Sequence, residues 1–114
     1  MSASETPLRR DHLSIHVILW RFRVRMDRES EFERAYGPVG EWTLLFRRGD
    51  GYLGTELLRH SEDLREYLTV DRWASRAAYE AFRDRFSSEY RQLDRRLEEL
   101  TEEEALIGTF EVLG

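Results

Sequence analysis

One stretch of the sequence places an aromatic ring and a carboxylate where they could act together on a bound molecule. Asp71 and Trp73 lie two residues apart in an alternating run, so both side chains point to the same face of a predicted strand. Trp20 lies on the apolar face of another predicted strand. Because burial raises the pKa of a carboxyl group toward the range of a useful base, these residues predict an aromatic slot with Asp71 as its base.

Each of these residues also has a purely structural interpretation. Trp73 could fill the junction between a strand and the following helix, and Trp20 could pack in the core. Asp71 could form an ion pair with Arg21 or Arg72, which would give it a structural rather than a catalytic role. The sequence leaves both interpretations open.

The elements that would position these side chains follow from hydrophobic periodicity. Apolar residues alternate with a period of two in the predicted strands and recur every three or four residues in the predicted helices. Asp27 and Ser75 are predicted helix N-caps, and Thr101 followed by Glu104 has the spacing of a capping box. We predict strands at 15–26, 52–60, 65–73 and 106–113, and helices at 28–36, 41–46 and 76–97.

This order predicts a single α+β domain over residues 14–114, preceded by a flexible N-terminal tail at 1–13. Its topology is ferredoxin-like, βαββαβ, with the helices on one face of a four-stranded antiparallel sheet. The other face would carry apolar side chains, which normally require a partner. We therefore expect a homodimer packed sheet to sheet. The apolar side chains expected on that face are Val17, Leu19, Leu68 and Val70.

Composition excludes several classes of chemistry. The sequence has no Cys, so disulfides, thiolate nucleophiles and thiolate metal sites are excluded. It also has no Lys, which excludes Schiff-base chemistry. The net charge of −5 argues against nucleic acid as a partner. No apolar run reaches the length of a membrane span and no signal peptide is evident, so we expect no membrane partner and a cytoplasmic location.

Several segments, which cover the chain from about Ile15 to Leu113, form a recognisable set: VILWRFRV, FERAYGPVGEW, GYLGTELLR, YLTVDRWAS followed by AYEAF, and IGTFEVL. Together they resemble the antibiotic biosynthesis monooxygenase family of dimeric α+β barrel proteins. The resemblance implies a family with cofactor-independent oxygenases of aromatic polyketides, haem-degrading enzymes and quinol oxygenases. It implies a pocket between sheet and helices, lined by the tryptophan that matches Trp73.

Haem-degrading relatives would pair that tryptophan with an Asn on the first strand and a His on the following helix. Here Trp20 occupies the first-strand position and the helix at 76–97 contains no His, so the expected axial ligand is missing. The resemblance instead implies a monooxygenase without cofactor or metal, acting on a polycyclic phenol or quinol in secondary metabolism or detoxification. Such an enzyme needs a dry aromatic slot, a base and a cation to hold the phenolate.

The residues assigned to this site are of two kinds. Trp73, Asp71 and Trp20 are the predicted catalytic residues. The predicted contacts to a small aromatic substrate are Tyr36, Trp42, Phe46, Tyr67, Tyr79, Phe82 and Phe86.

Other readings of the sequence stay open. A small-molecule-binding or accessory protein of the same fold would have its pocket filled by its own aromatic side chains. An isomerase or cyclase would use Asp71 or a histidine as a proton shuttle, although His16 and His60 lie at strand ends. The arginines at positions 21, 23 and 25 are expected to pair with acidic residues, and the acidic run at 102–104 reads as a solvated turn.

Overall fold

The computed structural model describes residues 14–114, so the tail predicted for residues 1–13 lies outside the described part of the chain. The strands are β1 (His16–Val24), β2 (Tyr52–Arg59), β3 (Glu66–Trp73) and β4 (Thr101–Glu111). The helices are α2 (Glu29–Tyr36), α3 (Glu41–Phe46), α4 (Arg76–Arg85), α5 (Ser87–Leu97) and the short 3₁₀ helix η1 (Glu98–Leu100).

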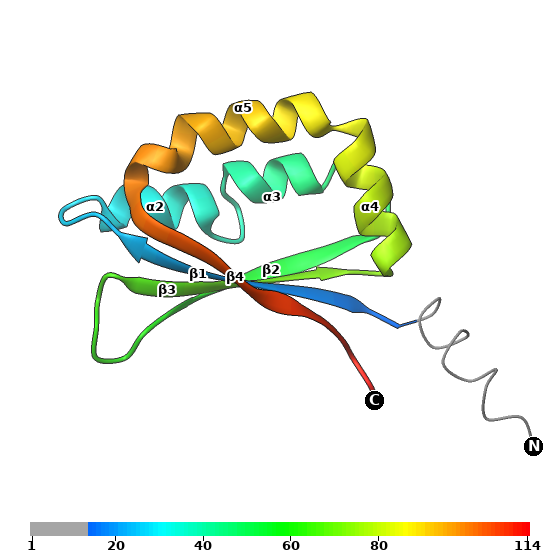
Figure 1. Ribbon diagram of the computed structural model, residues 1–114, viewed down its shortest axis with the longest axis horizontal. Coiled ribbons are helices and arrows are strands. Elements are labelled where there is room, and N and C mark those ends of the chain that lie inside the picture. Colours follow the sequence, from blue (N-terminus) through cyan, green and yellow to red (C-terminus); the bar gives the residue numbers. More distant parts are fainter. Residues whose placement is uncertain (1–13) are drawn as a thin grey trace, which may run out of the picture.

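The four strands form one antiparallel sheet in the order β2-β3-β1-β4, and the helices lie over one of its faces (Figure 1). This confirms the predicted ferredoxin-like α+β fold. In the register of the two central strands, Ile18 lies opposite Asp71 and Trp20 lies opposite Thr69. The predicted slot residues on the first and third strands therefore do share one face of the sheet.

The core fills the space between the sheet and the helices. Phe22 and Tyr67 rise from the sheet and pack against Phe32 of α2, with ring centroids 5.3 and 4.8 Å away. On the opposite face of the sheet, Val70 is buried beside half-buried Leu19, while Phe110 is exposed. The face away from the helices is thus apolar at its centre and carries no covering element from residues 14–114 (Figure 1).

Two of the three arginines at positions 21, 23 and 25 pair with acidic side chains, as predicted. Arg21 bonds to Glu66 at 2.9 Å, and Arg23 bonds to Asp63 at 2.7 Å. Arg25 donates instead to the backbone carbonyl of Glu99 at 2.8 Å. Arg21 and Arg23 tie neighbouring strands and the loop before β3 together on the face of the sheet away from α2 to α5, whereas Arg25 ties the end of β1 to η1.

The helix predicted over 76–97 is two helices. The break lies at Phe86, whose φ of −110° and ψ of 28° leave the helical region. Ser87 and Ser88 follow, and serine competes with the helical hydrogen bonds of its own backbone. The bend lets α4 run down to the edge of the sheet while α5 crosses above it (Figure 1). Phe82 of α4 and Leu93 of α5 are consequently both buried.

Two of the three predicted caps are wrong. Asp27 has a φ of 69°, because the chain reverses directly after β1, and its side chain does not cap α2. Arg28 is the N-cap instead and makes no side-chain cap bond. Thr101 does not start a helix, because β4 begins there and pairs along β1. The run 102–104 is therefore strand rather than a solvated turn, and Glu103 lies opposite Arg23.

Ser75 does cap α4, because its hydroxyl accepts a hydrogen bond from the Ala78 N–H at 3.0 Å. We expect Ser75→Ala to lower the free energy of unfolding by about 1 kcal/mol, since one N–H of the first turn loses its partner. Thermal denaturation followed by circular dichroism measures this. Ser30→Ala, on the exposed side of α2, is the control. An equal loss in both variants would contradict the capping role.

Candidate active site

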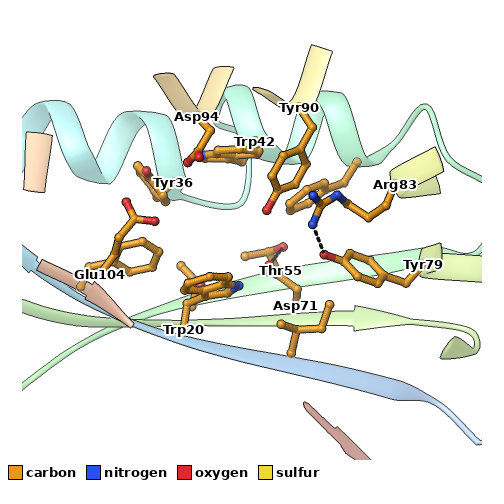
Figure 2. Close-up of a pocket in the computed structure, with 14 residues that line it drawn as sticks. Trp20, Tyr36, Trp42, Thr55, Asp71, Tyr79, Arg83, Tyr90, Asp94 and Glu104 are labelled. Carbon is orange, nitrogen blue, oxygen red and sulfur yellow. Dashed lines mark hydrogen bonds between the residues drawn. The ribbon is translucent and has the colours of Figure 1, made fainter. Parts of the chain in front are cut away.

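A cavity of about 230 Å³ lies between the sheet and the helices. Figure 2 shows its floor formed by side chains of the sheet and its roof by side chains of the helices. Its lining is mainly aromatic, with a smaller number of charged and hydroxyl groups. The lining residues are Ile18, Trp20, Phe22, Tyr36, Trp42, Phe46, Thr55, Thr69, Asp71, Tyr79, Arg83, Tyr90, Asp94 and Glu104.

The structure brings six of the predicted site residues together around this cavity. Trp20 and Asp71 stand on the sheet side, and Trp20 is only half-buried although it lies on the apolar face of β1. The aromatic side chains that line the cavity leave its volume of about 230 Å³ unfilled. The six predicted residues that line it are Trp20, Tyr36, Trp42, Phe46, Asp71 and Tyr79.

Trp73 does not line the cavity. Its side chain is 0% exposed and lies one layer behind the wall, with its ring centroid 5.9 Å from that of Phe46 and 5.5 Å from that of Tyr79. The strand ends at Trp73, and Phe82 of α4 folds onto it with ring centroids 5.0 Å apart. A direct catalytic role for Trp73 stays a prediction, and the geometry gives it contacts through which it could position Tyr79.

Three other predicted contact residues also lie outside the cavity lining. Tyr67 donates a hydrogen bond from its hydroxyl to Glu33 at 2.5 Å, away from the cavity. Phe82 packs between Trp73 and Phe86. The rings of Tyr67, Phe82 and Phe86 therefore pack in the hydrophobic core that surrounds the cavity.

Asp71 is the most deeply buried carboxyl group in the cavity wall. It is 7% exposed, and its Oδ1 accepts a hydrogen bond from the Thr55 hydroxyl at 2.6 Å. Thr55 in turn lies 2.6 Å from the hydroxyl of Tyr52. Burial raises the pKa of Asp71 to about 6, against the opposing effect of the Thr55 bond. Among residues 14–114, Asp71 has no ion-pair partner.

The ion pair considered for Asp71 is therefore absent from the described structure. Arg72 bonds to Glu56 at 2.7 Å and Arg21 bonds to Glu66. Both arginines point to the open face of the sheet, because neighbouring residues of a strand face opposite sides. The carboxyl group of Asp71 therefore lies in a largely apolar wall without an ion-pair partner among the described residues.

Arg83 is the cation among the residues that line the cavity. Its guanidinium carbon lies 3.8 Å from the ring centroid of Tyr90, and its Nη1 donates to the Tyr79 hydroxyl at 3.1 Å (Figure 2). The Nε–H of Arg83 is buried and has no hydrogen-bond partner in the described part of the chain. A buried donor without a partner costs free energy, which an acceptor on a bound molecule would recover.

The sequence carried a signal for the lining residues on α4 and α5 that the prediction missed. Arg83, Tyr90 and Asp94 continue the helical stripe that contains Tyr79 and Leu93, so polar side chains interrupt an otherwise inward-facing apolar stripe. Glu104 was assigned to a turn, yet in β4 it lies on the helix-facing side. Sequence reasoning also missed the lining residues Ile18, Thr55 and Thr69.

The model of the family described as antibiotic biosynthesis monooxygenase matches residues 15–93. The chain belongs to this family. The match includes the strands and helices that contribute most of the cavity wall, and it ends before β4. The resemblance drawn from the sequence segments is thereby confirmed.

Solved structures give the same result for the fold of this family member. A Bordetella bronchiseptica protein assigned to the antibiotic biosynthesis monooxygenases is 22% identical with a TM-score of 0.71, over 88% of this chain and 98% of that chain. SnoaB, a cofactor-independent oxygenase from Streptomyces nogalater, is 20% identical with a TM-score of 0.70, over 89% of this chain and 95% of that chain. At these identities the similarity concerns the fold. A comparison with curated proteins gave no significant match.

The two histidines that the structure of this family member describes, His16 and His60, do not line the cavity. His60 accepts hydrogen bonds at Nδ1 from the backbone N–H groups of Glu62 and Asp63, both at 3.0 Å, and thus holds the turn between β2 and β3. His16 is buried, which lowers its pKa, and packs near Tyr79. In residues 14–114 no group of three His, Cys, Asp or Glu side chains could hold a metal ion, and no helix is suited to span a membrane.

Proposed function

We propose that this protein is a monooxygenase that acts without a cofactor on a small, flat aromatic phenol or quinol. The observation that carries the proposal is an aromatic cavity holding one buried carboxyl group with a pKa of about 6, Asp71, and one guanidinium, Arg83. The membership in the antibiotic biosynthesis monooxygenase family supports it. So does the shared fold with SnoaB, a cofactor-independent oxygenase.

The two charged groups divide the work that such a reaction requires. Asp71 takes the phenolic proton as a general base, and the resulting phenolate is electron-rich enough to reduce oxygen directly. Arg83 stabilises the negative charge, and its unpartnered Nε–H supplies a donor for the phenolate oxygen. For an anthrone-type substrate, a ring CH₂ group and O₂ give a ring carbonyl and water. One oxygen atom enters the product and the other leaves as water.

The size of the cavity limits the substrate. An apolar cavity of about 150 Å³ holds benzene, whereas this cavity measures about 230 Å³. The space therefore fits a fused aromatic system somewhat larger than one ring, lying against Trp20 and beneath Trp42 (Figure 2). Of the polycyclic substrates predicted from the sequence, the smaller ones therefore match the volume of this cavity best.

Oxygen uptake by the purified protein tests the proposal. The protein is first treated with chelator and checked by absorption spectroscopy for flavin and haem, and then mixed with naphthols, hydroquinones and anthrones. We expect uptake in proportion to protein concentration for at least one substrate. Arg83→Gln should reduce it about 10-fold to 100-fold, since the phenolate loses its charged donor. Substrate consumption without oxygen uptake would instead indicate proton-transfer chemistry at Asp71.

We further propose a homodimer formed through the open face of the sheet. Leu19 and Val70 lie at its apolar centre, and Phe110 is exposed beside them. When a second copy covers this patch, each Å² of apolar surface removed from water contributes about 25 cal/mol of favourable free energy to association. Arg21 and Arg23, which are paired with acidic residues, border this centre.

A charge at the centre of this face should prevent assembly. We expect the natural chain to elute as a dimer in size-exclusion chromatography with light scattering, and Leu19→Glu to elute as a monomer. Leu44→Glu, which changes an exposed leucine on α3, is the matched control and should remain dimeric. A monomeric natural chain, or a dimeric Leu19→Glu variant, would contradict this interface.

A further inference from the structure

The charges that face the cavity are unbalanced. Three carboxyl groups line it, those of Asp71, Asp94 and Glu104, against the single guanidinium of Arg83. That guanidinium donates from Nη1 to Tyr79 and stacks on Tyr90, and its Nε–H is without a partner among the described residues. A molecule in the cavity therefore meets more negative than positive charge.

Two of the carboxyl groups lie at the end of the cavity away from Asp71. Glu104 on β4 is opposite Phe22 of β1, while Asp71 on β3 is opposite Ile18. These β1 positions are four residues apart, or about 13 Å along a strand. Figure 2 shows Asp94 and Glu104 beside Tyr36 at one end, and Asp71 and Arg83 toward the other.

The carboxyl groups of Asp94 and Glu104 lack the partners that acidic residues elsewhere have. Within residues 14–114, neither forms an ion pair or a hydrogen bond that satisfies ordinary geometry, whereas Asp63 and Glu66 are both held by arginines. Partial burial is the largest cause that raises the pKa of both groups, although Glu104 as a residue is exposed. The charge of Glu98 raises the pKa of both groups, and Asp94 also raises that of Glu104, whereas Arg83 lowers that of Asp94 and the Thr101 hydroxyl lowers that of Glu104. Two neighbouring carboxyl groups in this state are stabilised by a cation.

A second feature at this end also calls for a ligand. Trp42 is 7% exposed, and its buried indole N–H makes no hydrogen bond with any residue in the described range, although it lies near the Tyr36 hydroxyl. Its ring and those of Trp20 and Tyr36 offer aromatic surfaces beside the two carboxyl groups. Carboxylates combined with aromatic faces bind ammonium groups through charge and cation–π attraction.

We propose that the cavity selects aromatic substrates that carry a protonated amine at the end lying against Asp94 and Glu104, and that it rejects substrates with a carboxylate there. The inference deepens the proposed function and rests on it for the use of the cavity. The substrate is then bipolar, with its phenol at Asp71 and Arg83 and its ammonium group at the far end. An oxygen atom next to the amine would accept the free N–H of Trp42.

Calorimetric binding measurements test the inference without requiring turnover. Three matched ligands are compared: a naphthol, the same naphthol with an aminomethyl group on its second ring, and the same naphthol with a carboxyl group at that position. We expect the amine to bind at least about tenfold more tightly than the parent naphthol, the usual effect of a charge-assisted hydrogen bond, and the acid to bind more weakly.

Variants assign the preference to the two carboxyl groups. Asp94→Asn and Glu104→Gln should each reduce several-fold the ratio of the amine's affinity to that of the parent naphthol, with both affinities measured on the same variant. Glu103→Gln is the matched control, because this substitution removes the same charge from the neighbouring position, whose side chain lies on the other face of β4. Circular dichroism confirms that each variant is folded.

The outcomes separate this inference from the proposed function. An amine that binds no better than the parent naphthol would overturn it, as would a preference that survives in both variants. Oxygen uptake is recorded on the same samples. An amine preference without oxygen uptake would support the ligand class and count against the oxygenase, whereas oxygen uptake without an amine preference would do the reverse.

Discussion

Replacing Asp71 with asparagine is expected to lower oxygen uptake about 10²-fold to 10⁴-fold, the usual contribution of a general base. The amide has nearly the same shape and can still accept the hydrogen bond from Thr55, so the geometry of the cavity wall is kept. In the natural protein, uptake should rise with pH through about 6, as Asp71 loses its proton. Asp71→Asn should remove that rise. Steady-state oxygen-electrode measurements across this pH range check both expectations.

The same substitution is expected to stabilise the protein near neutral pH. The folded pKa of Asp71, about 6, lies above its ordinary value of 3.8, so the folded state binds more protons and stability falls as pH rises between these values. Above pH 6 the buried charge costs about 1 to 3 kcal/mol, which the amide avoids. Urea denaturation should therefore show the gain at about pH 8 and little difference at about pH 4.

Asp50→Asn is the control for both measurements, because Asp50 is exposed in the turn before β2. The oxygen uptake and the free energy of unfolding of this variant should equal those of the natural protein within experimental error. Uptake retained within a few-fold in Asp71→Asn would remove Asp71 from the role of base. A loss of stability near neutral pH would mean that its charge is compensated in the folded protein.

Trp73→Ala is expected to give the largest loss of stability, about 3 to 5 kcal/mol in the free energy of unfolding. The side chain is fully buried and packs against the rings of Phe46, Tyr52, Tyr79 and Phe82, so the truncation leaves a cavity that these rings cannot close. Urea denaturation measures the loss. If Trp73→Ala is too unstable to purify, Trp73→Phe is measured instead. It should lose less stability, because most of the ring contacts remain.

Trp20→Ala is the informative comparison, because Trp20 is half-buried and faces the cavity. It should cost less stability than Trp73→Ala but reduce the affinity for a naphthol more strongly. In Trp73→Phe, oxygen uptake per folded molecule should stay within several-fold of the natural protein. A much larger loss of uptake with little loss of stability would restore the direct catalytic role that the sequence predicted for Trp73.

The sheet part of the site could be predicted from the sequence because side chains alternate strictly along a strand. Alternation alone placed Trp20 and Asp71 on one face, and the register confirms it. It also placed Trp73 on that face, correctly. What alternation does not give is depth, and Trp73 is covered because α4 folds onto the end of β3 and seats Phe82 against it.

The helix part of the site was harder to predict, since charged residues are normally assigned to the solvent side of a helix. Arg83 and Asp94 stand on the inward side instead, where a cavity replaces core packing. The break at Phe86, which turns α4 and α5 toward different parts of the sheet, has no strong breaker such as proline to mark it. Glu104 was hidden in an acidic run whose strand pairing depends on distant β1.

The most direct test of the central claim is incorporation of labelled oxygen. The metal-free and flavin-free protein is supplied with ¹⁸O₂ and the naphthol or anthrone that gives the fastest oxygen uptake, and the product is analysed by mass spectrometry. A monooxygenase at this cavity predicts one ¹⁸O atom per product molecule, at a rate that Asp71→Asn lowers at least about 10²-fold. Product that carries no label, or that forms equally fast with Asp71→Asn, would contradict it.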